Sequence, residues 1–184
     1  MIKLPDIYYH GTISIHVPSL MEGIIVDKNK GRPDFGKGFY LTSNLIEAEK
    51  WAIRKAGYEN TDRTSEEQVV PVILVARIIN SDLAKLAGKI FKVPDVIWAE
   101  FVYNNRRAED FFHDFDFVYG PIADGKNKLW PVFEKYKNRK ISLEKLVELI
   151  SPQEGQDQIS FNTPIALGYL KVSGIREVRT RWAN

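Results

Sequence analysis

Residues 31–43 read GRPDFGKGFYLTS, and parts of this stretch match two well-known nucleotide-binding motifs. Its first seven residues have the G-x-x-x-x-G-K spacing of a phosphate-binding loop, and residues 34–36 spell the DFG of protein kinases. A phosphate-binding loop follows a hydrophobic strand, has Ser or Thr after the lysine, and opens a helix. Here polar residues precede the stretch, Gly38 follows the lysine, and residues 39–42 are typical of a strand. The kinase interpretation fails because the chain has no H-R-D loop, no V-A-I-K strand and too few residues for two lobes.

The composition predicts one folded domain over residues 1–184, since domains typically hold about 100–200 residues. A hydrophobic content of 44% excludes a disordered chain. The formal net charge of +2 argues against an extended basic surface that grips duplex nucleic acid by charge alone. Because the chain has no cysteine, disulfides and thiolate metal sites are excluded. It contains neither a signal peptide nor a membrane-spanning run, so we expect a soluble, cytoplasmic protein without a membrane partner.

Short strands and helices are mixed along the chain without strict βαβ alternation, which predicts an α+β fold. Gly11 is expected to end the first strand, and a polar loop is expected at 27–38. The predicted strands cover residues 7–10, 39–42, 69–79, 115–119, 158–161 and 174–182. The predicted helices cover residues 17–25, 45–56, 81–87, 96–105, 126–136, 142–150 and 165–170. Ser43 or Asn44 can cap the second helix, and Ser142 the sixth.

Several segments follow one another in an order that carries a family resemblance. They are His10-Gly11, residues 34–42 (DFGKGFYLT), Trp51-Ala52, Asn105-Arg106, residues 116–124 (DFVYGPIAD) and residues 157–163 (DQISFNT). Together they resemble a bacterial family of domains of unknown function allied to the ADP-ribosyltransferase superfamily, in its diphtheria-toxin-like branch. The resemblance extends over residues 8–170. It implies a split β-sandwich of two small sheets flanked by helices, with NAD in the cleft between them.

The resemblance also implies roles for individual residues. His10 would contact a ribose hydroxyl, the backbone of Gly11 would hold the nicotinamide carboxamide, and Tyr40 would stack on the cationic ring. Arg106 would pair with the pyrophosphate. The remaining candidates for contact with NAD are Thr12, Asp34, Phe35, Gly36, Gly38 and Ser43. Ordinary structural roles remain open for these residues, since His10 and Tyr40 can pack in a core and the glycines can shape a turn.

The resemblance implies that Gln158 stands at the third catalytic position, where many active members of the superfamily have Glu. A glutamine can donate to and accept from a ribose hydroxyl, but it carries no charge and cannot act as a base. We therefore expect transfer of a single ADP-ribose rather than synthesis of a polymer. Gln158 also leaves open a catalytically silent module that binds NAD or a protein.

These inferences predict an NAD-dependent mono-ADP-ribosyltransferase that releases nicotinamide and modifies a protein or nucleic acid. By analogy it would be a toxin or defence effector, neutralised by an antitoxin encoded nearby. Residues 9–12 (YHGT) also resemble RNA 2′-phosphotransferases, but these need several arginines and only Arg32 precedes Arg54. No metal is expected, because the acidic residues and His113 within 109–124 match no ligand spacing. The basic run 135–140 is a solvated helix end or a contact for nucleic acid or an acidic partner.

Overall fold

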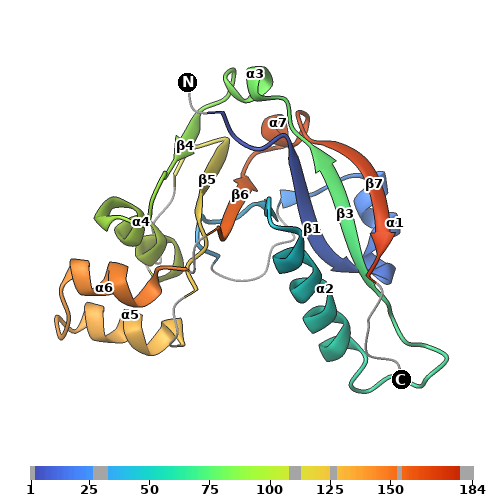
Figure 1. Cartoon of the computed structure of the whole chain (residues 1–184), viewed down its shortest axis with the longest axis horizontal. Helices are drawn as coiled ribbons and strands as arrows, with labels where there is room; N and C mark the ends of the chain where they lie inside the picture. Colours follow the sequence, from blue (N-terminus) through green and yellow to red (C-terminus); the bar gives the residue numbers. More distant parts are fainter. Residues whose placement is uncertain (1–2, 27–32, 108–112, 125–127, 153–154, 179–184) are drawn as a thin grey trace.

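The computed structural model describes residues 3–26, 33–107, 113–124, 128–152 and 155–178, which form two β-sheets with helices outside them (Figure 1). The three-stranded sheet has the order β1 (Ile7–Ile13), β3 (Pro71–Arg77), β7 (Lys171–Glu177). The four-stranded sheet has the order β2 (Phe39–Leu41), β6 (Asp157–Phe161), β5 (Phe117–Pro121), β4 (Gly88–Ile90). Neighbouring strands are antiparallel except β4 and β5. The predicted α+β class, with two small sheets flanked by helices, is confirmed.

The helices are α1 (Val17–Glu22), α2 (Leu45–Glu59), α3 (Asn80–Leu83), α4 (Val96–Arg107), α5 (Leu129–Lys137), α6 (Leu143–Ile150) and α7 (Pro164–Leu167). Side-chain caps begin α2, α4, α6 and α7, since Asn44, Asp95, Ser142 and Thr163 each accept a hydrogen bond from a backbone amide of the first turn. In Figure 1, α2 lies on the side of the three-stranded sheet and α4, α5 and α6 lie beyond the four-stranded sheet. No helix in the described ranges is long and apolar enough to cross a membrane.

Several predicted boundaries were wrong. The first strand continues through Gly11 to Ile13, and β7 begins at Lys171 rather than at Gly174. The helix predicted at 81–87 is only the short α3, and β4 follows it where no strand was predicted. The helix predicted at 165–170 ends at Leu167. Residues 27–32 of the predicted loop, the start of the helix at 126–136 and the end of the strand at 174–182 lie outside the described residues.

Both faces of the four-stranded sheet are buried, each in its own hydrophobic cluster. Phe39, Ile159 and Phe161 pack between the two sheets with Tyr8 and other residues of the three-stranded sheet. The opposite face packs under α4, α5 and α6, in the cluster of Val118, Trp98, Phe133 and Leu146. Strand alternation and the pairing of Tyr40 with Ser160 place Tyr40 and Gln158 on this helix-covered face. His10 shares its face of β1 with Tyr8, which faces the other sheet.

The two sheets are joined at one bridge, between Tyr9 of β1 and Thr42 just after β2. The amide of each residue donates to the carbonyl of the other, at 2.8 Å and 2.9 Å. No other isolated bridge is found within the described ranges. The sheets therefore part directly beside His10 and Gly11, which places these residues at the opening between them.

Candidate functional site

Gly11 is required by the packing of α2 on β1. A Cβ atom at this position would collide with the carbonyl oxygen of Ala48 and lie 2.9 Å from the amide nitrogen of Ala52. Ala48 and Ala52 are buried, so the helix backbone lies directly on the strand. The resemblance implies that a ligand approaches the backbone of Gly11, but the close approach that the structure shows is that of α2.

The backbone edge of β1 at Gly11 is nevertheless exposed to the opening between the sheets. Tyr9 exchanges both its backbone hydrogen bonds with Thr42, so its N–H and C=O point away from β3. These groups point to alternate sides along a strand, so those of Gly11 point the same way as those of Tyr9. No bridge to β2 follows Tyr9 in the described part of the chain. Gly11 therefore offers a donor and an acceptor to a planar polar group.

His10 is held as a neutral hydrogen-bond acceptor. Its Nδ1 lies 2.8 Å from the backbone oxygen of Tyr40, and because a carbonyl can only accept, Nδ1 carries the proton. Burial lowers the pKa of His10 to about 4, against the opposing effect of this hydrogen bond, and the charge of Lys55 lowers it further. At neutral pH the imidazole is uncharged, and its Nε2 has a lone pair available for a hydroxyl donor. The ring also packs on Phe39, with 4.5 Å between centroids.

The hydroxyl of Tyr40 is hydrogen-bonded to the loop at residues 33–38, which precedes its own strand β2. The hydroxyl donates to the carbonyl of Gly36 at 2.6 Å and accepts from the amide of Phe35 at 2.9 Å. Burial raises the pKa of Tyr40, so the phenol is protonated at any physiological pH. Its ring is only partly buried. The hydroxyl is thus occupied, and the residue packs against the cluster under α4, α5 and α6 while keeping part of its surface exposed.

The loop at 33–38 packs as part of the core. Phe35 is fully buried in the cluster under α4, α5 and α6. Gly36 has a φ of +77°, a conformation that favours glycine, and a Cβ there would lie 2.8 Å from Oδ1 of Asn105. Gly38 lies against β6, where a Cβ would come within 2.9 Å of Nδ2 of Asn162. Packing and backbone conformation therefore account for Phe35, Gly36 and Gly38, three of the predicted NAD contacts, without a ligand.

Asp34 brings together two other predicted site residues, Arg106 and Gln158. Its carboxylate is 3% exposed; Oδ1 lies 2.5 Å from Nε of Arg106, and Oδ2 accepts from Nε2 of Gln158 at 2.6 Å. Oδ2 also accepts from the amide of Ala123 at 2.9 Å. This contact explains a glutamine at position 158, because a glutamate would place a second carboxylate against Asp34. It also fixes the orientation of the Gln158 amide and leaves Oε1 as the acceptor.

Asp157 is a polar residue of this region that our sequence analysis missed. It accepts from the amide of Ser43 at 2.8 Å, from the Ser43 hydroxyl at 2.6 Å and from the Tyr119 hydroxyl at 2.9 Å. Ser43, a predicted NAD contact, is therefore held by Asp157. The remaining candidate, Thr12, is buried with its hydroxyl 3.4 Å from Nδ1 of His16. The signal for Asp157 was its place as first residue of the DQISFNT segment.

Residues 7–172 match a family described as protein of unknown function (DUF3990), and the chain belongs to this family. The match confirms membership of a family of domains of unknown function. No curated protein and no solved structure matches the chain. These comparisons show the family and no link to the ADP-ribosyltransferase superfamily.

Proposed function

We propose that this protein binds NAD where the two sheets part and transfers one ADP-ribose to a macromolecular acceptor, releasing nicotinamide. The observation that carries this proposal is the pairing of a neutral imidazole acceptor at His10 with the exposed backbone edge of Gly11. The order of the motifs along the chain supports it. The acceptor is a protein or a nucleic acid, and the role as a toxin or defence effector with an antitoxin rests on the family resemblance alone.

The backbone edge of Gly11 suits the carboxamide of nicotinamide. A primary amide is planar and carries a donor and an acceptor side by side, so it can pair with the N–H and C=O of one residue as a strand does. His10 is next to this edge, and its Nε2 accepts from a ribose hydroxyl. The ring of Tyr40 adds an aromatic surface for the cationic pyridinium.

Trp51 adds a second aromatic surface on the α2 side of the site. Lys55 of α2 is close enough for its charge to lower the pKa of His10. Trp51 lies one turn before Lys55 on the same side, and 55% of it is exposed. The guanidinium of Arg54 lies 4.9 Å from the Trp51 ring centroid and leaves the opposite face of the ring for a ligand.

The reaction breaks the bond between ribose C1′ and the nicotinamide nitrogen, and its electron pair neutralises the pyridinium. The ribosyl group passes through an oxocarbenium-like state, and an acceptor nucleophile bonds to C1′ and loses its proton to solvent. Gln158 accepts from a ribose hydroxyl through Oε1, while the Asp34 carboxylate polarises its amide from behind. Gln158 thus acts on the developing cation through the ribose hydroxyl and places no formal charge directly against it.

A catalytically silent NAD-binding module is the second candidate. It is favoured by the neutral Gln158 amide, which is tied to a carboxylate whose charge is already offset by Arg106. Both candidates use His10 and Gly11 for binding, and they differ only in whether nicotinamide leaves.

The test is chromatographic measurement of free nicotinamide after the purified protein is incubated with NAD and cell lysate as a source of acceptors. We expect release by the wild-type protein and a reduction of about 100-fold in His10→Gln, which replaces the fixed imidazole acceptor with a flexible amide. His16→Gln is the matched control, with circular dichroism to check that both variants fold. NAD binding that depends on His10 without any release would select the silent module, and the absence of both would refute the site.

A further inference from the structure

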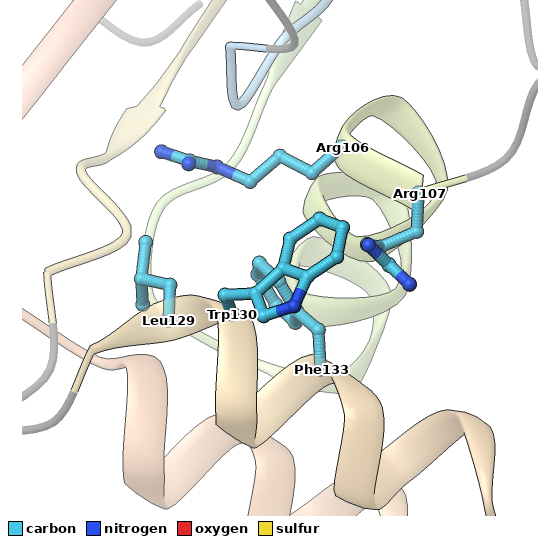
Figure 2. Close-up of a pocket in the computed structure, with 5 residues that line it drawn as sticks. All are labelled: Arg106, Arg107, Leu129, Trp130 and Phe133. Carbon is cyan, nitrogen blue, oxygen red and sulfur yellow. The ribbon is translucent and has the colours of Figure 1, made fainter.

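A cavity of about 250 Å³ lies between α4 and α5. Its lining consists of Arg106, Arg107, Leu129, Trp130 and Phe133 (Figure 2). Two guanidinium groups and an indole thus surround a hollow with an apolar floor. This combination is typical of sites for ligands that carry both an anionic group and a flat ring.

Arg106 presents an oriented guanidinium edge to this cavity. Its Nε is held by the buried carboxylate of Asp34 at 2.5 Å, and its side chain is 30% exposed. Its two terminal nitrogens have no hydrogen-bond partner in the part of the chain that the structure describes. Figure 2 shows the side chain extended from the end of α4 across the cavity, in the direction of Leu129. Arg106 is therefore prepared to donate two hydrogen bonds to one oxyanion.

Trp130 provides the flat surface. The guanidinium carbon of Arg107 lies 3.6 Å from the centroid of the indole, and Arg107 is itself paired with Glu134 on the same helix as Trp130. The indole is 61% exposed, so the face opposite Arg107 is open. An aromatic ring backed by a guanidinium on one side and open on the other is a stacking platform for a nucleobase.

We propose that this cavity binds one nucleotide, with a phosphate on the terminal nitrogens of Arg106 and the base on the open face of Trp130. A volume of about 250 Å³ lies slightly below the usual range of ligand pockets and suits one nucleotide rather than a dinucleotide. The nucleotide has two possible sources, the adenylate half of NAD or a residue of single-stranded nucleic acid. The inference rests on the cavity and does not require the proposed function.

The charges around the cavity predict how binding responds to salt. Asp34 offsets the charge of Arg106, and Glu134 offsets that of Arg107. Lys137 lies two turns after Trp130 on the same side of α5 and is exposed. Only about two phosphates are thus contacted by cations, which for a single strand gives a log–log salt slope of roughly −1.4. Stacking should dominate the affinity.

The experiment measures binding of three probes, AMP, ADP-ribose and a fluorescein-labelled 12-nucleotide single strand, by calorimetry and fluorescence anisotropy. Trp130→Ala should weaken binding about tenfold, and Trp130→Phe should restore most of it because an aromatic face remains. Arg106→Gln should weaken binding of all phosphate-bearing probes. Arg63→Gln removes the same charge from an ion pair with Glu59 and should change nothing.

The relative affinities for the 12-mer and for ADP-ribose distinguish the two possible sources of the nucleotide. Preference for the 12-mer over ADP-ribose assigns the cavity to nucleic acid, and the opposite preference assigns it to NAD; both support a nucleotide site. Absence of binding at millimolar probe, or equal binding by wild type and Trp130→Ala, would overturn the proposal. So would a phosphoserine peptide that binds as tightly as the nucleotides. Nicotinamide release by Trp130→Ala, measured in parallel, shows whether the catalytic site works independently of the cavity.

Discussion

Two aspartates hold the four-stranded sheet from different sides, and they are stabilised in different ways. Asp34 is buried and combines an ion pair with Arg106 with hydrogen bonds from Gln158 and Ala123. Asp157 accepts only from neutral donors, chiefly the amide and hydroxyl of Ser43 and the hydroxyl of Tyr119. The stability of the helix-covered face therefore depends on an ion pair, whereas the stability of the junction between the sheets depends on a network of hydrogen bonds.

The largest effect on stability should come from Asp34→Asn. The substitution leaves the guanidinium of Arg106 beside an uncharged amide and weakens the bonds to Gln158 and Ala123. Because the partner is partly exposed, we expect a loss of about 3 kcal/mol in the free energy of unfolding. Urea unfolding followed by circular dichroism measures it. Asp82→Asn, in the exposed pair with Lys85, is the control and should change stability little; equal losses in both variants would contradict the central role of Asp34.

Asp157→Asn should have a smaller effect. One side-chain oxygen can still accept, but the new amide group faces the Ser43 and Tyr119 donors and leaves one of them unsatisfied. We expect a loss of about 2 kcal/mol by the same measurement. Tyr119→Phe removes a single donor and should cost about 1 kcal/mol. If Tyr119→Phe proved the more harmful, the network would be centred on the tyrosine rather than on the carboxylate.

Gln158→Glu should give an effect as small as that of Tyr119→Phe, and one that depends on pH. The introduced carboxyl lies against Asp34, which raises its folded-state pKa above the unfolded value of about 4.3. The folded state then binds a proton more tightly, so the variant is destabilised at pH 7, by about 1 kcal/mol, and recovers as the pH falls. Urea midpoints at pH 7 and 4.5 measure this, with the exposed Gln68→Glu as control. An offset that is unchanged between the two pH values would mean that the new side chain points to solvent.

Local patterns in the sequence predicted the fold class and most elements, because they act over a few residues. Asn44 and Ser142 cap helices as expected. Gly11 was wrongly expected to end a strand, since its local signal is that of a strand breaker while its actual partner is the backbone of α2. Strand β4 has only three residues and is defined by its pairing with β5, which no local pattern reveals.

The candidate site was predictable only in part, for a similar reason. The structure places His10 beside the backbone of Tyr40. It also places Gln158 on the same face of the four-stranded sheet as Tyr40. The family resemblance selected these three residues. It could not show that Gln158 donates to Asp34, because these residues are 124 positions apart. Nor could it show that Phe35 is buried rather than available to a ligand. Contacts between distant segments decide which polar residues are occupied.

The Tyr9–Thr42 bridge makes relative movement of the two sheets visible to amide hydrogen exchange. Each of these residues protects the other's amide proton, and both protons depend on this one contact across the junction. Opening of the junction would expose the two protons together, while amides between β1 and β3 stay protected. Two resonances in a nuclear magnetic resonance spectrum would then report how often the sheets separate, and whether a ligand at the opening holds them together.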